Sequence, residues 1–390
     1  MSKLEELIKQ YCPDGVEWKT LGDYLSYEQP TLYLVASTKY DDNYPTPVLT
    51  AGQSFILGYT NEENGIFQAS KDAPVIIFDD FTTSFHWVEF PFKVKSSAMK
   101  MLRPTDKKKA MFRYLYYCMK NILYTPGDNT RQWIGTYSQF EIPVPPLPVQ
   151  EEIVRILDTF TELQAELQAE LQKRKQQYNY YRDNLLSFDG RTDVEWKKLG
   201  EVCFKTNNIK WKSTKEIYQY IDLTSVDIQT HSILSAVEID SLSAPSRAQQ
   251  IVKENDVIFA TTRPTQMRVC LVPSEYDGQI CSTGYCVLRP NSSIVLPQYL
   301  FFVLAVESFK IYLLNNQTMG NYPSISNNTL KDYIIPIPPI AEQQMIIDIL
   351  DRFDTLTNDL TAGLPAEIEK RRQQYEYYRD KLLTFKRKEA

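Results

Sequence analysis

The sequence predicts an α+β protein in which two α+β domains are separated by a pair of long helices. These helices are expected to form an antiparallel coiled coil with internal pseudo-two-fold symmetry. Three observations lead to this prediction. A frame of short segments occurs twice in the 390 residues. Each copy ends in a long polar segment with an apolar stripe, and the blocks inside the frame carry strand-like and helix-like patterns. A chain of this length is also long for a single domain.

The frame consists of an opener, a proline-rich hinge and a long polar segment. An internal repeat has to be identified before a fold is assigned, because a missed repeat leads to the wrong fold. The last segment is the most similar, because 12 of its 16 letters are identical in the two copies. The paired segments are VEWKTLGDY at Val16 and VEWKKLGEV at Val194; IPVPPLPVQEEIVRILDTF at Ile142 and IPIPPIAEQQMIIDILDRF at Ile335; KRKQQYNYYRDNLLSF at Lys173 and KRRQQYEYYRDKLLTF at Lys370.

The long segments are expected to be helices. Apolar residues recur at steps of three, four or seven from Ile156 to Leu185, and again from Ile349 to Leu382. This narrow stripe is typical of a coiled-coil seam. About 40 residues of helix span about 60 Å. Because each helix follows its own block, the two should pack antiparallel, and the alternative is a coiled-coil spacer without further meaning.

The second long segment contains an additional tetrapeptide with Gly363 and Pro365. Four added residues nearly complete a turn, so the apolar stripe survives the insertion. A glycine and a proline inside a helix weaken or kink it. We therefore expect a bend or a break in the second helix at this point.

The two blocks between openers and hinges are expected to be separate α+β domains. Alternating apolar and β-branched runs such as APVIIFDDF and DVIFATT predict strands, and PQYLFFVLAVESFKIYLLNN predicts a helix. The domain boundaries that follow are residues 1–142 for the first domain, with a short N-terminal helix; 143–188 for the first long helix; 189–335 for the second domain; and 336–390 for the second helix and the C-terminal tail.

The residue types needed for several kinds of catalytic chemistry are missing. The six cysteines include no C-x-x-C pair, which favours a reducing cytoplasm and argues against a disulfide scaffold or a zinc ribbon. The two histidines, His86 and His231, lie in different blocks, so no two-histidine metal site is expected. No glycine-rich nucleotide loop is present, and no apolar run approaches a membrane span. We expect a cytoplasmic, non-enzymatic chain that binds neither a metal nor a membrane.

The net charge of −6 gives no global sign of nucleic-acid binding, so this interpretation rests on local groups. A basic segment in the first block can neutralise phosphates, and Arg263, Gln266 and Arg268 can read guanine or adenine edges. The alternative for each is an ordinary solvated surface residue. The candidate DNA contacts are Lys93, Lys95, Lys100, Arg103, Arg131, Gln132, Lys210, Lys212, Arg263, Gln266, Arg268, Asn321 and Tyr322; Lys107, Lys108 and Lys109 extend the basic segment.

The doubled VEWK-x-LG openers, the two IP-x-PP hinges and the QAEL-type tetrads resemble the DNA specificity subunits of Type I restriction-modification systems over essentially the whole chain. The resemblance implies two target recognition domains, each reading one half of a bipartite, asymmetric double-stranded DNA target. It also implies helices that set the spacer and dock two methyltransferase (M) subunits, to which motor-nuclease (R) subunits are added. S-adenosylmethionine is then expected on the methyltransferases, and no cofactor on this chain.

The repeated polar letters of the long segments are candidates for docking two copies of one partner, since even these letters recur. The alternative is solvation of an ordinary coiled coil. For the whole chain, the competing hypotheses are a structural coiled-coil scaffold with two protein-binding domains and a self-sufficient modification enzyme. The candidate docking residues are Lys173, Arg174, Gln177, Tyr181, Lys370, Arg371, Gln374 and Tyr378.

Overall fold

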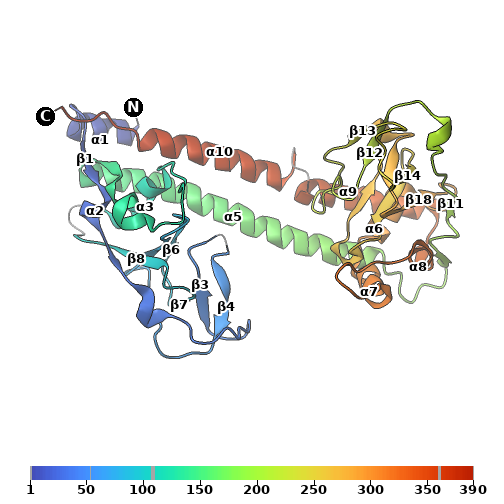
Figure 1. Cartoon of the computed structure of the whole chain (residues 1–390), viewed down its shortest axis with the longest axis horizontal. Coiled ribbons are helices and arrows are strands. Elements are labelled where there is room, and N and C mark those ends of the chain that lie inside the picture. The colour runs from blue at the N-terminus through green and yellow to red at the C-terminus, as the bar shows by residue number, and fades with distance from the viewer. Residues whose placement is uncertain (1, 53, 107–109, 359–361, 390) are drawn as a thin grey trace. The chain divides into compact units, whose positions relative to one another are not determined.

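The computed structural model describes residues 2–52, 54–106, 110–358 and 362–389. The chain divides into two compact units, one formed by Met1–Ala165 with Arg371–Ala390 and the other by Glu166–Lys370. Each unit joins an α+β domain to portions of the long helices (Figure 1). Segments from the two ends of the sequence thus meet in the first unit.

The α+β domain of the first unit is built from short strands and a few short helices. Its helices are α1 (Lys3–Tyr11), α2 (Leu21–Tyr24), α3 (Phe112–Lys120) and α4 (Gln132–Gly135), with 3-10 turns η1 (Pro30–Tyr33) and η2 (Tyr137–Gln139). Its strands are β1 (Glu17–Thr20), β2 (Leu25–Glu28), β3 (Thr46–Leu49), β4 (Ile56–Thr60), β5 (Val75–Asp79), β6 (Phe85–Val88), β7 (Lys93–Val94), β8 (Met99–Pro104) and β9 (Glu141–Val144).

These strands form an antiparallel sheet of order β2-β8-β5-β6, a sheet of order β4-β3-β7 and a β1-β9 ribbon. The central strand β5 is apolar and buried on both sides, as Val75, Ile76 and Ile77 are fully inaccessible. Ile76 shares a buried cluster with Tyr114 of α3 and with residues of the repeated long segments, among them Leu157 and Leu383. The domain is therefore packed directly on the helical part of its unit.

The second unit has the same kind of domain with different elements. Its helices are α6 (Pro297–Val303), α7 (Glu307–Asn316) and α8 (Asn327–Lys331), with 3-10 turns η3 (Trp211–Ser213), η4 (Pro264–Gln266) and η5 (Ser274–Tyr276). Its strands are β10 (Glu195–Lys198), β11 (Cys203–Phe204), β12 (Tyr218–Ile221), β13 (Val237–Ile239), β14 (Ala248–Ile251), β15 (Val257–Ala260), β16 (Val269–Leu271), β17 (Ile280–Ser282), β18 (Tyr285–Pro290) and β19 (Ile334–Ile337).

Two four-stranded sheets, β11-β18-β15-β16 and β13-β12-β17-β14, accompany the ribbon β10-β19 in this unit. The pair β12 and β17 is parallel, whereas its neighbours are antiparallel. Apolar residues of β15, α6 and α7 form a core with α9. Both domains are thus α+β, as predicted, while their sheets differ.

The repeated sequence frame makes repeated contacts. Gln150 accepts a hydrogen bond from the Met111 backbone at 2.9 Å and donates to the Pro145 carbonyl at 2.7 Å. Its counterpart Gln343 accepts from the Leu296 backbone and donates to the Pro338 carbonyl, both at 2.8 Å. A buried glutamine that pairs with backbone on both sides fixes its hinge. Each hinge is therefore held in the same way.

The long helices are α5 (Leu147–Leu185) and, in the second copy, α9 (Ile340–Asn358) followed by α10 (Leu364–Leu382). Gly363 lies in a bend just before α10, where the sequence predicts a break. Part of the additional tetrapeptide, residues 359–361, lies outside the described residues.

The two long segments run antiparallel within each unit, as predicted. In the first unit, Glu141 pairs with Arg387, and Phe160 further along stacks on the earlier Tyr378. In the second unit, Tyr181 stacks on Phe353. The ion pair between Arg191 and Glu342 shows the same reversal of order there, because a later residue of one segment meets an earlier residue of the other.

In the described ranges, no single helix is both long and apolar enough to cross a membrane. Only α6 and α7 taken together, with a 65° bend between them, reach the necessary length and apolarity.

Candidate nucleic-acid interface and helix-pair surface

The second unit contains a cavity of about 580 Å³ in its α+β domain. Arg263, Gln266 and Arg268, which are close in sequence, meet Tyr322 here across a loop. The cavity therefore combines cations, an amide and an aromatic ring, which are the groups that contact DNA bases and phosphates. Its lining residues are Leu223, Thr224, Arg247, Thr262, Arg263, Gln266, Arg268, Tyr322 and Ser324.

The turn that carries Arg263 is held in a strained conformation. Arg263 and Met267, at the two ends of η4, have φ of 50° and 55°. Left-handed backbone at a residue other than glycine costs on the order of 1 kcal/mol. The backbone N–H of Arg263 donates to the Pro323 carbonyl at 2.7 Å, and Thr262 bridges to Ser324. The turn is therefore fixed to the loop that presents Tyr322.

This fixation places the Arg263 guanidinium over the Tyr322 ring, with its central carbon 5.3 Å from the ring centroid. Tyr322 is 72% exposed, so the pair is available at the surface. Cation–π stacking orients a guanidinium without using its five N–H donors. The pair can thus present a planar donor array to a base edge or to a phosphate.

Arg268 lines the same cavity, but its donors are partly used inside the domain. Its Nη1 donates to the carbonyls of Leu223 at 2.6 Å and Val226 at 2.5 Å, which holds the loop after β12. Arg247 is exposed and lines the cavity without having been predicted. Nothing in its surrounding sequence SAPSRAQQ distinguishes it from an ordinary surface arginine.

The other second-domain candidates are solvent-exposed. Asn321 precedes Tyr322 in the same loop. Lys210 and Lys212 flank Trp211, whose indole N–H donates to the Ala248 carbonyl at 2.7 Å. This hydrogen bond positions the two lysines at the end of a strand, outside the cavity lining. Their geometry suits contacts to phosphates better than a base pocket.

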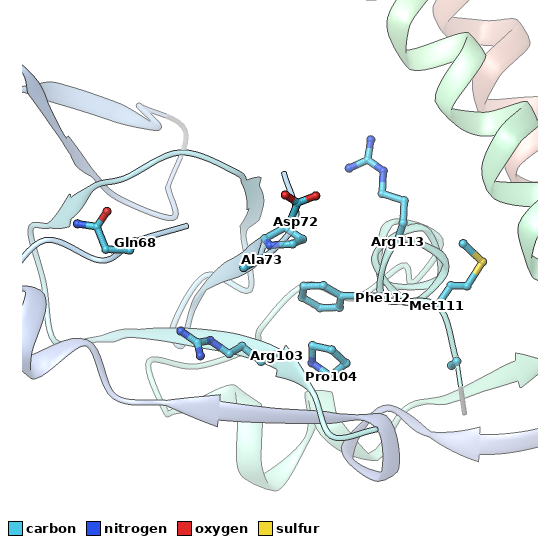
Figure 2. A pocket seen from close by; sticks show the side chains of 10 residues that line it. Gln68, Asp72, Ala73, Arg103, Pro104, Met111, Phe112 and Arg113 are labelled. Carbon is cyan, nitrogen blue, oxygen red and sulfur yellow. The ribbon is translucent and has the colours of Figure 1, made fainter. Parts of the chain in front are cut away.

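The first unit has a cavity of about 490 Å³ between the end of β8 and the start of α3. Figure 2 shows Arg103 coming from β8 and Arg113 from α3, with Phe112 and Pro104 between them in this view. The Arg103 guanidinium lies 4.8 Å from the centroid of Phe67. Arg113 donates to Asp158 at 2.8 Å and thereby ties α3 to α5. Of the predicted DNA contacts, Arg103 lines this cavity.

Two of the predicted lysines are inside the domain. Lys93 is 3% exposed and Lys100 is 1% exposed. Lys93 pairs with Glu62 at 3.1 Å and donates to the Asn64 carbonyl at 2.6 Å. Lys100 pairs with the buried Asp80 at 3.2 Å. Their charges are compensated within the fold, so neither ammonium group is available to a phosphate, contrary to the prediction.

Glu62 shows the effect of this internal pairing. Burial raises its pKa, but hydrogen bonds from the backbone of Ser37 and Ala36 and the neighbouring Lys93 ammonium outweigh it and lower the pKa below its usual value. Lys93 therefore has an ionised partner at neutral pH. Lys95 and Arg103 are exposed on the same segment, whereas Lys107, Lys108 and Lys109 lie outside the described residues.

Gln132 is also structural. It is 2% exposed, accepts a hydrogen bond from the Tyr124 hydroxyl at 2.7 Å and donates to the Thr130 carbonyl at 3.0 Å. A buried amide satisfied in this way cannot read a base without breaking these bonds. Its neighbour Arg131 is exposed at the start of α4. Of this predicted pair, only Arg131 stays available for a DNA contact.

The repeated segment of the long helices shows which predicted docking residues face outward. Lys173 and Lys370 are exposed. Arg174 pairs with Glu170 at 2.7 Å and also donates to Gln177 at 3.0 Å. In the other copy, Arg371 donates to Gln374 at 3.2 Å.

The two tyrosines predicted as docking residues also contact the opposite long segment. Tyr181 stacks on Phe353 and Tyr378 on Phe160. Their neighbours Tyr180 and Tyr377 are 67% and 61% exposed. These two tyrosines were not predicted as docking residues, although the repeated letters YNYYRD and YEYYRD place them outside the apolar stripe. Exposed tyrosines at equivalent places of a repeat are candidates for partner contacts.

Comparisons with known proteins agree with this architecture. The family model described as "Type I restriction modification DNA specificity domain" matches residues 13–174 and 192–370. The specificity subunit of the type I restriction enzyme EcoR124I/EcoR124II of Escherichia coli is 43% identical, covering 100% of this chain and 98% of that protein. A putative type I restriction enzyme specificity subunit of Haemophilus influenzae is 28% identical, with 98% of each chain covered.

A solved structure supports the fold alone. The S subunit of a Type I restriction-modification system from M. genitalium matches with a TM-score of 0.56 and 12% identity, covering 95% of this chain and 96% of that chain. The duplicated frame, the two different α+β domains, the family match over most of the residues and the full-length relative agree with one another. The chain belongs to the family of Type I restriction-modification DNA specificity subunits.

Proposed function

We propose that this chain is the DNA-reading, non-catalytic subunit of a Type I complex, in which each domain reads one half of a bipartite, asymmetric target. The observation that carries the proposal is a frame with repeated contacts that holds two domains with different sheets. A repeated frame with unlike inserts suits two readers of different sequences. A structural scaffold accounts for this arrangement less directly, because a scaffold does not need two domains that read different sequences.

In the second domain, the Arg263–Tyr322 pair is the proposed reader of bases. A guanidinium that donates two hydrogen bonds to one guanine edge discriminates by about 1–3 kcal/mol. Gln266 lines the same cavity and Asn321 precedes Tyr322 in its loop, and the amide of either can bind an adenine edge. Lys210 and Lys212 then bind phosphates and position the domain.

In the first domain, the exposed cations are proposed to bind the other half of the target. Lys95 and Arg103 lie on the basic segment, and Arg131 lies at the start of α4. Arg103 has a ring partner in Phe67, as Arg263 has in Tyr322. This similarity supports Arg103 as the base-reading cation of the first domain.

The paired helices are proposed to set the unspecified spacer and to dock two methyltransferase subunits. Duplicate polar segments offer two equivalent surfaces to one kind of partner. The candidate docking residues are Lys173, Arg174, Gln177, Tyr181, Lys370, Arg371, Gln374 and Tyr378, and Tyr180 and Tyr377 extend the surface.

The remaining chemistry is assigned to the partners. The methyltransferases carry S-adenosylmethionine and flip the target adenine out of the duplex, which needs a pocket that surrounds the base. Motor-nuclease subunits join to cut DNA. This chain binds no cofactor in the proposed complex, and a cytoplasmic location follows from its DNA target.

Reconstitution of this chain with a Type I methyltransferase subunit tests the proposal. The complex should methylate adenine in one split sequence, and the isolated chain should not bind S-adenosylmethionine. A complex that methylates without sequence preference, or a chain that methylates DNA alone, would contradict it.

A further inference from the structure

The N-terminal helix α1 covers one end of the helix pair in the first unit. Leu4 is buried in the same cluster as Ile153 of α5 and Leu383 next to α10. Lys3 of α1 pairs with Glu152 of α5 at 2.9 Å, and Glu152 is only 4% exposed. Figure 1 shows α1 beside the start of α5 and the end of α10. Glu152, which also pairs with Arg155 at 2.6 Å, is thus a buried acid beneath α1.

The repeat defines the corresponding place in the second unit. Ile153 and Ile156 correspond to Ile346 and Ile349, and Leu382 and Phe385 correspond to Leu185 and Phe188, with identical residue types. All four second-unit residues line a groove of about 400 Å³. The groove is therefore the counterpart of the α1 seat. Its lining residues are Asn184, Leu185, Ser187, Phe188, Asp189, Arg191, Glu342, Met345, Ile346 and Ile349.

Among the described residues of the second unit, no helix covers this groove as α1 covers its own seat. The described stretch between the end of α5 at Leu185 and the start of β10 at Glu195 contains no helix. Met345, which stands where the first copy has Glu152, is 65% exposed, and Ile349 is 41% exposed. The side chain at the covered position is a buried acid, while the one at the uncovered position is an exposed apolar residue. This is the reverse of what solvent exposure favours.

We propose that this groove docks an amphipathic helix of another protein, with an apolar residue where α1 has Lys3. The chain itself supplies the precedent, since α1 is such a helix on the equivalent surface. The second copy has Met345 where the first copy has Glu152, so a lysine placed over Met345 finds no carboxylate for an ion pair. This difference favours an occupant with an apolar residue at that position. A second copy of this chain is disfavoured for the same reason, and its α1 is already seated in its own first unit. The inference does not depend on the DNA-reading role.

The charged lining of the groove includes an ion pair of its own. Arg191 and Glu342, which both line the groove, pair with each other. The occupant is therefore selected mainly by its apolar face.

Two peptides of residues 1–11, one natural and one carrying K3L, test the proposal on the full-length chain by fluorescence anisotropy. The K3L peptide should bind saturably and more tightly than the natural peptide. Substitution M345E should weaken the K3L peptide by about tenfold and reverse the preference, because it restores an acid opposite Lys3. In the same unit, M319E alters a residue that is 89% exposed and outside the groove, so it should leave both affinities unchanged.

Oxidation of Met345 by hydrogen peroxide gives a second readout, and the bound K3L peptide should slow it while Met319 reacts as before. Absence of saturable binding up to about 1 mM, or affinities that ignore M345E, would overturn the proposal. Sedimentation that shows a dimer of the chain dissolved by M345E would overturn the named occupant and assign the groove to a second copy.

Discussion

The ring of Phe160 stacks on the ring of Tyr378, with centroids 5.5 Å apart and planes inclined by 24°. The corresponding rings of Phe353 and Tyr181 stack at 5.8 Å and 30° in the other unit. Each pair joins the first copy of one frame segment to the second copy of another. The contact thus occurs once in each unit and fixes the antiparallel register of the helices there.

Substitution F160A should destabilise the first unit by about 2 kcal/mol, because it removes a half-buried ring and the stacking contact of that ring with Tyr378. Substitution F353A should have a similar effect on the second unit. Chemical denaturation followed by fluorescence measures both changes. A loss below about 0.5 kcal/mol for either variant would show that the stacked pair does not hold the helices together.

Substitution R263A should relax discrimination at one position of one half-site by about 1–3 kcal/mol. The fold should be unaffected, because the guanidinium is exposed and stacked on Tyr322. Binding of the reconstituted complex to a panel of single-base variants measures the effect. Substitution K212A is the matched control, since loss of a phosphate contact weakens all sequences alike and reduces the salt slope by about one. Uniform weakening by R263A would contradict a base-reading role.

Substitution D80N should destabilise the first domain by about 3–5 kcal/mol, because it leaves the Lys100 ammonium buried without its charge partner. The double variant D80N with K100M should be less destabilised than D80N alone. Thermal unfolding of the variants measures both effects. Equal losses in the single and double variants would show that the charges do not interact.

The acid sensitivity of the first unit should depend on Glu152. The Arg155 guanidinium, followed by the Lys3 ammonium, lowers the pKa of Glu152 from 4.5 to about 2 in spite of burial. A carboxyl with a lowered folded pKa contributes stability above its unfolded pKa. That contribution is lost as pH falls from about 4.5 towards 2. Denaturation as a function of pH should show a shallower acid slope for E152Q, and an unchanged slope would contradict the assignment.

The frame of the fold could be predicted because it is written twice. The hinges and apolar stripes identify the helices, and their place after each domain identifies the antiparallel direction, which Phe160 and Tyr378 confirm. The break near Gly363 also followed from residue chemistry. These features depend on local pattern, which a sequence displays directly.

The roles of Lys93, Lys100 and Gln132 could not be predicted, because they depend on distant partners. Lys100 lies in β8 between buried methionines, and its partner Asp80 comes from the end of another strand. Counting charges in a basic segment does not reveal which side chains face inward. Arg263 and Tyr322 were each predicted as candidate DNA contacts, but their pairing was not, because it depends on a left-handed turn that the sequence does not announce.

The most direct measurement exchanges residues 189–335 for the second domain of a relative with a different target and sequences the methylome of cells that carry the exchanged chain. The account predicts methylated adenines in a new split sequence, in which one half is unchanged and the other half is new. A change in both halves, or no change in either, would contradict the claim that each domain reads its own half.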